Sequence, residues 1–106
     1  MAPQDRERLA RELLELTQSM LAHARAGEWA DLALKETRRQ ALARDLFATP
    51  VPPEAAPVVA DCVRDVLTLD QELIQLTEAS REQAARAVTQ AQKGQQAATV
   101  YKRFSR

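Results

Sequence analysis

The 106-residue chain is poor in the residues that build sheets and tight loops. It has only two glycines, two phenylalanines, one tyrosine and one tryptophan, Trp29. The glycines are too far apart in the sequence to form a glycine-rich loop that cradles a phosphate group. Alanine, leucine, glutamine, arginine and glutamate dominate instead, and all of them are good helix formers. The composition therefore predicts an all-α fold.

The chain has one cysteine, Cys62, and one histidine, His23. A lone cysteine cannot form an internal disulfide, so we expect a reducing, cytoplasmic environment. Cys62 falls in an apolar helical pattern, which favours a buried and inert thiol. His23 lies near a predicted helix end, where the helix dipole favours a solvent-facing imidazole. We therefore predict no enzyme activity, no metal site and no cofactor.

Charge and hydropathy exclude two further classes of protein. Fifteen basic residues balance fifteen acidic ones, so we expect no direct nucleic-acid binding. Two short basic runs, at 35–39 and 101–106, are interpreted as solvated faces, with phosphate binding as the alternative. No apolar run reaches the roughly 18 residues of a membrane span, and no apolar signal-peptide core is present. We predict one cytoplasmic domain over residues 1–106.

Apolar periodicity and helix-breaking residues predict an antiparallel three-helix bundle with a long third helix and a short fourth helix at the C-terminus. The expected helices cover residues 4–26, 28–48, 54–93 and 95–104. Gly27 suits the left-handed position that ends a helix. The proline-rich segment 49–53 cannot continue the second helix, and Gly94 allows a break before the fourth.

The large apolar residues of the predicted third helix stop near Leu76, and only Val88 and several alanines follow up to residue 93. A helix over 54–93 would span about 60 Å, whereas the first two helices would span about 31–35 Å. We therefore expect the end of the third helix to project from the bundle or to be covered by something else. Ten residues are marginal as an isolated helix, so the fourth helix should be ordered only when it docks.

Two positions predict contacts between helices. Trp29 follows the predicted end of the first helix and should brace the corner between the first two helices. Asp70 falls inside the apolar half of the third helix, where a carboxylate needs a partner. Arg38 is the candidate partner, while Glu36 and Arg39 stand three residues apart and could pair with each other.

The apolar stripes are about 160° wide on the first helix and about 180° on the third, whereas a surface helix shows roughly 100°. Two explanations stay open. The three helices bury this surface against one another, or part of it forms an exposed groove or a dimer seam. A groove between helices would suit an incoming amphipathic segment.

Three segments resemble the signatures of the FliT flagellar export chaperones. The first contains Gly27, Glu28, Trp29, Leu32, Arg38, Leu42, Leu46 and Phe47. The second is VLTLDQELIQL at 66–76, which is similar to the third-helix signature of that family. The third contains Gln92, Lys93, Gly94, Ala97 and Tyr101. They cover most of the chain in the family's order, and the departures are Arg39 in the helix-two stripe and a short tail after Tyr101.

The resemblance implies a small cytoplasmic chaperone of the flagellar type III export system. Its client would be the C-terminal segment of the filament-cap protein, and it would also contact the export ATPase apparatus. In enteric members the free chaperone also represses the master transcription activator of the flagellar genes, a role that varies across the family. The alternatives are an export chaperone for hook-associated proteins and a structural helical protein that forms a homodimer.

The resemblance also places the client groove between the second and third helices. The partner-binding residues would be Leu42, Leu46, Phe47, Val63, Val66, Leu67, Leu73 and Ile74. A regulatory tail would cover the groove through Val100, Tyr101 and Phe104, with Tyr101 anchoring the closed position. Trp29 is expected to support the helix corner rather than to touch the client.

Overall fold

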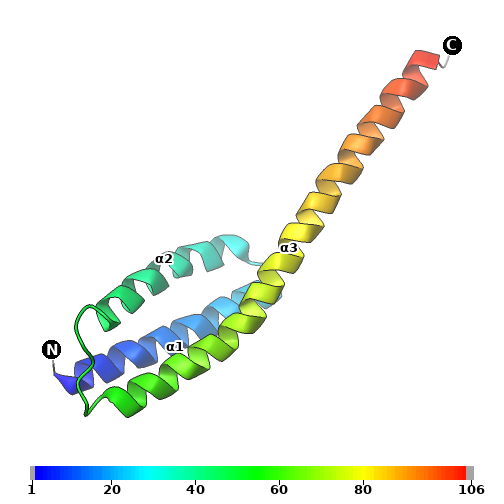
Figure 1. Cartoon of the computed structure of the whole chain (residues 1–106). Helices are drawn as coiled ribbons and strands as arrows, with labels where there is room; N and C mark the ends of the chain where they lie inside the picture. The colour runs from blue at the N-terminus through cyan, green and yellow to red at the C-terminus, as the bar shows by residue number, and fades with distance from the viewer. Residues whose placement is uncertain (1, 105–106) are drawn as a thin grey trace. The chain divides into compact units, whose positions relative to one another are not determined.

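The computed structural model describes residues 2–104, and these residues form three helices (Figure 1). The helices are α1 (Pro3–Ala26), α2 (Trp29–Leu46) and α3 (Ala56–Phe104). No strand occurs between residues 2 and 104. The all-α prediction is confirmed, and the first two helices lie close to their expected positions.

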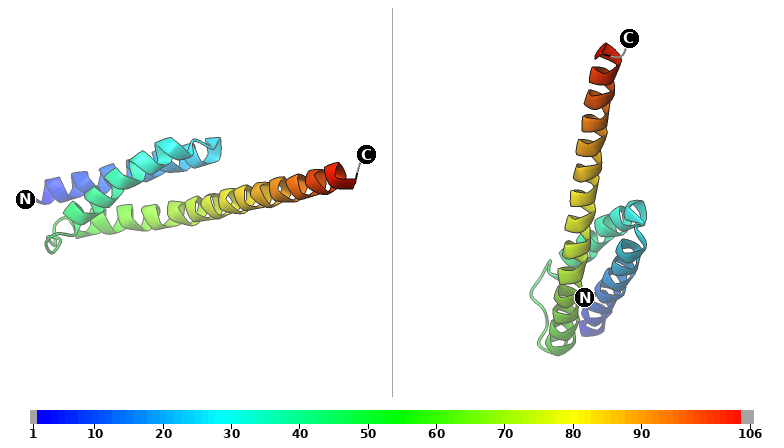
Figure 2. Two further views of the ribbon diagram at one scale, coloured as in Figure 1. Left: turned by 90° about the horizontal axis from the view of Figure 1, so that it is seen from above. Right: turned by 90° about the vertical axis from the view of Figure 1, so that its right-hand side faces the viewer.

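The chain divides into two compact units, Met1–Leu76 and Thr77–Arg106. The first unit holds α1, α2 and the first part of α3, and the second unit holds the remainder of α3. Within the first unit α2 runs antiparallel to α1, and the beginning of α3 lies beside α1 (Figure 2). Side chains from all three helices meet in its core.

The expected break at Gly94 and the separate fourth helix over 95–104 are wrong, because α3 continues to Phe104. Gly94 has no positive φ, unlike the glycine that ends α1. A glycine inside a helix costs about 1 kcal/mol relative to alanine. That cost does not stop a helix whose neighbouring residues are good helix formers and which has no proline after the glycine.

The core of the first unit consists of two apolar clusters. The first joins Ala10, Leu13, Leu46, Ala55, Val59, Cys62 and Val66. The second joins Met20, Leu21, Ala24 and Leu73, with Trp29 and Leu76 packed against it. Trp29 therefore braces the α1–α2 corner, as predicted. The large apolar side chains of α3 reach the core as far as Leu76, whereas the side chains of residues 81–104 are exposed.

Gly27 ends α1 in the left-handed conformation, with φ at 73°. Its N–H donates to the carbonyl of Ala24 at 3.1 Å, and the N–H of Glu28 donates to the carbonyl of His23 at 2.9 Å. Apart from Gly27 itself and its two chain neighbours, no residue comes within 4 Å of the place where a Cβ would stand. The position therefore favours glycine for its backbone conformation and not for lack of space.

Arg6 is a buried cation that the sequence patterns did not reveal, and it is only 3% exposed. Its guanidinium donates to the carbonyl oxygens of Leu46 at 3.1 Å and of Thr49 at 3.0 Å, and to the Thr49 hydroxyl. These carbonyls belong to the end of α2 and the loop after it, where a positive charge is favourable. Arg6 therefore ties the first turn of α1 to the α2–α3 loop.

Replacement of Arg6 by methionine should lower the free energy of unfolding by about 2–3 kcal/mol, because it keeps the apolar stem but leaves covered carbonyls without a donor. Arg8→Met is the matched control, since Arg8 is exposed and pairs with Asp5 one turn away. The control should change stability by about 0.5 kcal/mol or less. Urea unfolding followed by circular dichroism measures both, and equal effects would contradict the assigned role of Arg6.

Alanine at the two glycines should have opposite effects. Gly27→Ala forces a side chain into the left-handed region and should destabilise the protein by about 1–2 kcal/mol. Gly94→Ala should stabilise the helix locally by about 1 kcal/mol, because Gly94 lies inside α3 with open space around it. The measurements are urea unfolding for the first variant and far-ultraviolet circular dichroism for the second. A fall in helicity for Gly94→Ala would indicate a helix end at that residue.

Candidate partner-binding surface

Three of the predicted partner-binding residues lie in the core. Leu46 is 0% exposed, Leu73 is 6% exposed and Val66 is 7% exposed. Leu46 and Val66 belong to the first cluster, and Leu73 belongs to the second. Their side chains are covered by neighbouring helices in this conformation, so they would meet a partner only after a rearrangement. Their role as client contacts stays a prediction.

The other five predicted partner-binding residues reach the surface to different degrees. Phe47, Leu67 and Ile74 are all more than half exposed. Leu42 and Val63 are half-buried and pack against the first cluster. Leu67 and Ile74 stand seven residues apart on α3, so they lie on one face of that helix, while Phe47 follows the end of α2. These side chains give a partner accessible apolar area on the second and third helices.

The sequence patterns did not single out Leu34, whose side chain is 74% exposed on α2. Its neighbours on the same face, four and seven residues later, are Arg38 and Ala41. Leu34 is therefore an isolated apolar residue and not part of a stripe, which is why periodicity gave no signal for it.

A cavity of about 240 Å³ lies among the three helices of the first unit. Its lining residues are Leu13, Glu36, Arg39, Gln40, Ala43, Val66 and Asp70. An α-helix with side chains is about 10–12 Å in diameter, so this cavity is too small to admit one. A helical partner would therefore bind over the surface or would require α2 and α3 to separate.

Asp70 pairs with Arg39 and not with Arg38, so the predicted partner was wrong. Arg39 also pairs with Glu36 at 2.9 Å, which confirms the expected Glu36–Arg39 pair. Successive side chains on a helix are turned by about 100°, so when Arg39 faces Asp70 the side chain of Arg38 faces away from it. Arg38 lines a second cavity of about 240 Å³ together with Glu12 and Glu15. The half-buried Arg39–Asp70 pair connects α2 to α3 beside the first cavity.

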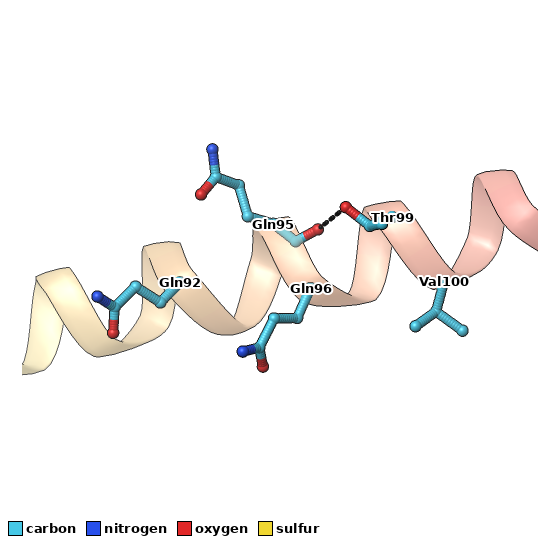
Figure 3. A pocket seen from close by; sticks show the side chains of 5 residues that line it. All are labelled: Gln92, Gln95, Gln96, Thr99 and Val100. Carbon is cyan, nitrogen blue, oxygen red and sulfur yellow. Dashed lines mark hydrogen bonds between the residues drawn. The ribbon is translucent and has the colours of Figure 1, made fainter.

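In the second unit a wide hollow is bordered by residues of α3 alone (Figure 3). Its lining residues are Gln92, Gln95, Gln96, Thr99 and Val100. The Thr99 hydroxyl donates to the carbonyl of Gln95 at 2.9 Å, as the dashed line in Figure 3 marks. Gln92, Gln96 and Val100 point to one side of the helix. Because these residues all come from one helix, they form an exposed helix surface and cannot enclose a ligand.

The predicted tail residues lie at the end of α3 and are exposed, with Val100 at 54%, Tyr101 at 73% and Phe104 at 79%. Charge is unevenly distributed along the chain, because all fifteen acidic residues come before residue 83. Residues 83–106 carry five of the fifteen basic residues and no acidic one. The end of α3 is therefore cationic and carries exposed aromatic rings. Its role as a regulatory tail stays a prediction.

Two other features concern reactive or titratable groups. Burial raises the pKa of the Cys62 thiol, so the thiol stays protonated and unreactive at neutral pH.

Arg25 donates two hydrogen bonds to Glu72, at 2.6 and 2.8 Å. These bonds lower the pKa of Glu72 and raise the pKa of Arg25. This exposed pair joins the end of α1 to α3.

The α1–α2 corner brings together three side chains that could hold a metal ion. The ligand atoms of His23, Glu28 and Asp31 all lie within 4.8 Å of one another. The sequence patterns did not predict this group, because their spacing matches no common metal-binding motif. The turn at Gly27 is what brings His23 next to Glu28.

Comparisons with known proteins identify the family. Residues 7–103 match the family model described as flagellar protein FliT. No curated protein and no solved structure matches the chain. No helix among residues 2–104 is both long and apolar enough to cross a membrane. The family match covers nearly the whole chain and includes all three segments whose pattern resembled that family. The chain therefore belongs to the FliT family of flagellar export chaperones.

Proposed function

We propose that this protein binds the C-terminal segment of the filament-cap protein in the cytoplasm and delivers it to the type III export apparatus. The observation that carries this proposal is the apolar surface of α3, where Leu67 is 60% exposed and Ile74 is 56% exposed on one face. Soluble proteins keep such side chains exposed in groups chiefly where a partner covers them. An amphipathic helix with apolar residues every three or four positions has the matching shape.

We propose that binding begins on the exposed side chains and then reaches the buried ones. Leu67 and Ile74 are available without any movement of the helices. Val66 and Leu73 lie on the same helix but face the core, so a client could contact them only if α1 or α2 moved away from α3. The Arg39–Asp70 pair opposes movement of α2, because it connects α2 to α3 beside the cavity.

Serine at both Leu67 and Ile74 should weaken binding of a peptide from the C-terminal segment of the cap protein by about tenfold or more, which corresponds to about 1.4 kcal/mol. The fold should persist, because neither side chain belongs to the core. Isothermal titration calorimetry gives the affinity, and circular dichroism checks the helices.

Leu34→Ser is the matched control, since Leu34 is even more exposed but lies on the polar side of α2. It should leave the affinity for the peptide unchanged. If the control and the double variant lost the same affinity for the peptide, the exposed face of α3 would not be the client-binding surface.

We propose that the end of α3 regulates client access through Val100, Tyr101 and Phe104. Deletion of residues 95–106 should strengthen binding of the cap-protein peptide severalfold, because it removes the segment that competes for the groove. The deletion should leave the first unit intact, since the side chains of residues 81–104 are exposed and contribute nothing to its core. Equal or weaker affinity by calorimetry would count against an autoinhibitory tail.

Two alternatives use the same apolar surface. As an export chaperone for hook-associated proteins, the chain would bind the corresponding segment of those clients and ignore the cap protein. As a homodimer, it would cover Leu67 and Ile74 with a second copy, and analytical ultracentrifugation on dilution would detect the dimer.

Contact with the export ATPase apparatus and repression of the flagellar master activator are proposed from the family resemblance alone.

A further inference from the structure

We propose that the α1–α2 corner is a binding site for a zinc ion, with His23, Glu28 and Asp31 as its protein ligands. The Nδ1 atom of His23 lies 3.1 Å from Oε1 of Glu28, and the ligand atoms of all three residues lie within 4.8 Å of one another. The site is separate from the proposed client surface, which none of these residues joins. It goes beyond the proposed function and does not depend on it.

The backbone holds two of the ligands in place. Gly27 adopts the left-handed conformation, and the N–H of Glu28 donates to the carbonyl of His23 at 2.9 Å. This closed turn sets the two side chains next to each other even though they belong to different helical segments. Asp31 lies in the first turn of α2, whose start is fixed by the packing of Trp29 against the second cluster. Metal sites need ligands on such rigid elements.

The charges at the corner favour a cation. Two carboxylates lie within 4.8 Å of each other, and like charges at that distance repel. Neither carboxylate pairs with a lysine or arginine in the described part of the chain, since Glu28 contacts His23 and Asp31 makes no ion pair. The side chain of Glu28 does not cap α2 either. The Asp31 oxygens can therefore bind a metal directly, whereas between His23 Nδ1 and Glu28 Oε1 zinc would replace the proton of the existing hydrogen bond.

The donor types and their spacing favour zinc over the alkaline-earth ions. Zinc bound to imidazole nitrogen and carboxylate oxygen has bond lengths of about 2.0–2.2 Å, which places tetrahedral donors about 3.4 Å apart. The His23–Glu28 pair is already near that spacing, and the exposed Asp31 carboxylate can close the remaining gap by side-chain rotation. Water would occupy the fourth position. Imidazole is a poor ligand for magnesium and calcium, which prefer oxygen donors.

The test is calorimetric titration of the untagged full chain with zinc chloride in a non-chelating buffer at neutral pH. We expect one zinc per chain and no detectable binding of magnesium. His23→Ala should abolish zinc binding, and Glu28→Gln and Asp31→Asn should each weaken it at least tenfold. The last two positions are exposed, so their variants test the site even if His23→Ala fails to fold.

Two controls separate this site from other metal ligands. Cys62→Ala removes the only thiol, and Asp45→Asn removes an exposed carboxylate from the other end of α2. Both variants should bind zinc as tightly as the unchanged chain. Zinc should also raise the melting temperature of the unchanged chain and of both controls, but not that of the Glu28→Gln/Asp31→Asn double variant.

Three results would overturn the proposal. They are a failure of the unchanged chain to bind one zinc by itself, zinc binding that survives the double carboxylate change, and magnesium binding as tight as zinc binding.

Discussion

The contact between Arg6 and the end of α2 is the interaction on which the arrangement of the three helices depends. The loop from α2 to α3 contains Pro50, Pro52 and Pro53, which have no N–H to donate. The carbonyls of Leu46 and Thr49 therefore need a donor from another part of the chain, and the Arg6 guanidinium supplies it. Leu46 and Ala55, on either side of the loop, are fully buried in one cluster. Arg6 thereby connects the start of α1 to the end of α2 and to the loop that leads into α3.

At the opposite end of the first unit a second set of contacts completes the packing. Gly27 reverses the chain, Trp29 packs on the second cluster, and the Arg25–Glu72 pair joins α1 to α3. The two ends of the first unit are therefore held together by different kinds of interaction. A buried cation satisfies carbonyls at one end, whereas a left-handed glycine and an aromatic side chain set the turn at the other.

The separation of buried from exposed side chains on α3 bears on the proposed function. The core keeps Val66 and Leu73 covered, while Leu67 and Ile74 on the same helix stay exposed. A packed face and an accessible apolar face therefore coexist on α3. The cationic end of α3 carries no part of that core, so its sequence is free to serve regulation or contact with another protein. A chaperone needs both properties, because it must stay folded when its client leaves.

Local signals in the sequence were enough to predict the helices, the corner at Gly27, the bracing role of Trp29 and the end of the apolar core near Leu76. They failed at Gly94, because a glycine that permits a helix end does not impose one when its neighbours favour helix. They also failed to separate Arg38 from Arg39 and gave no sign of the Arg6 contacts or of the His23–Glu28–Asp31 group.

The sequence by itself thus determined which segments are helical, since propensity, capping and periodicity act over a few neighbouring residues. Only the tertiary structure decided which charged side chains meet. The rotation of each helix about its axis depends on many distant packing contacts at once, and a rotation of about 100° exchanges one residue for the next.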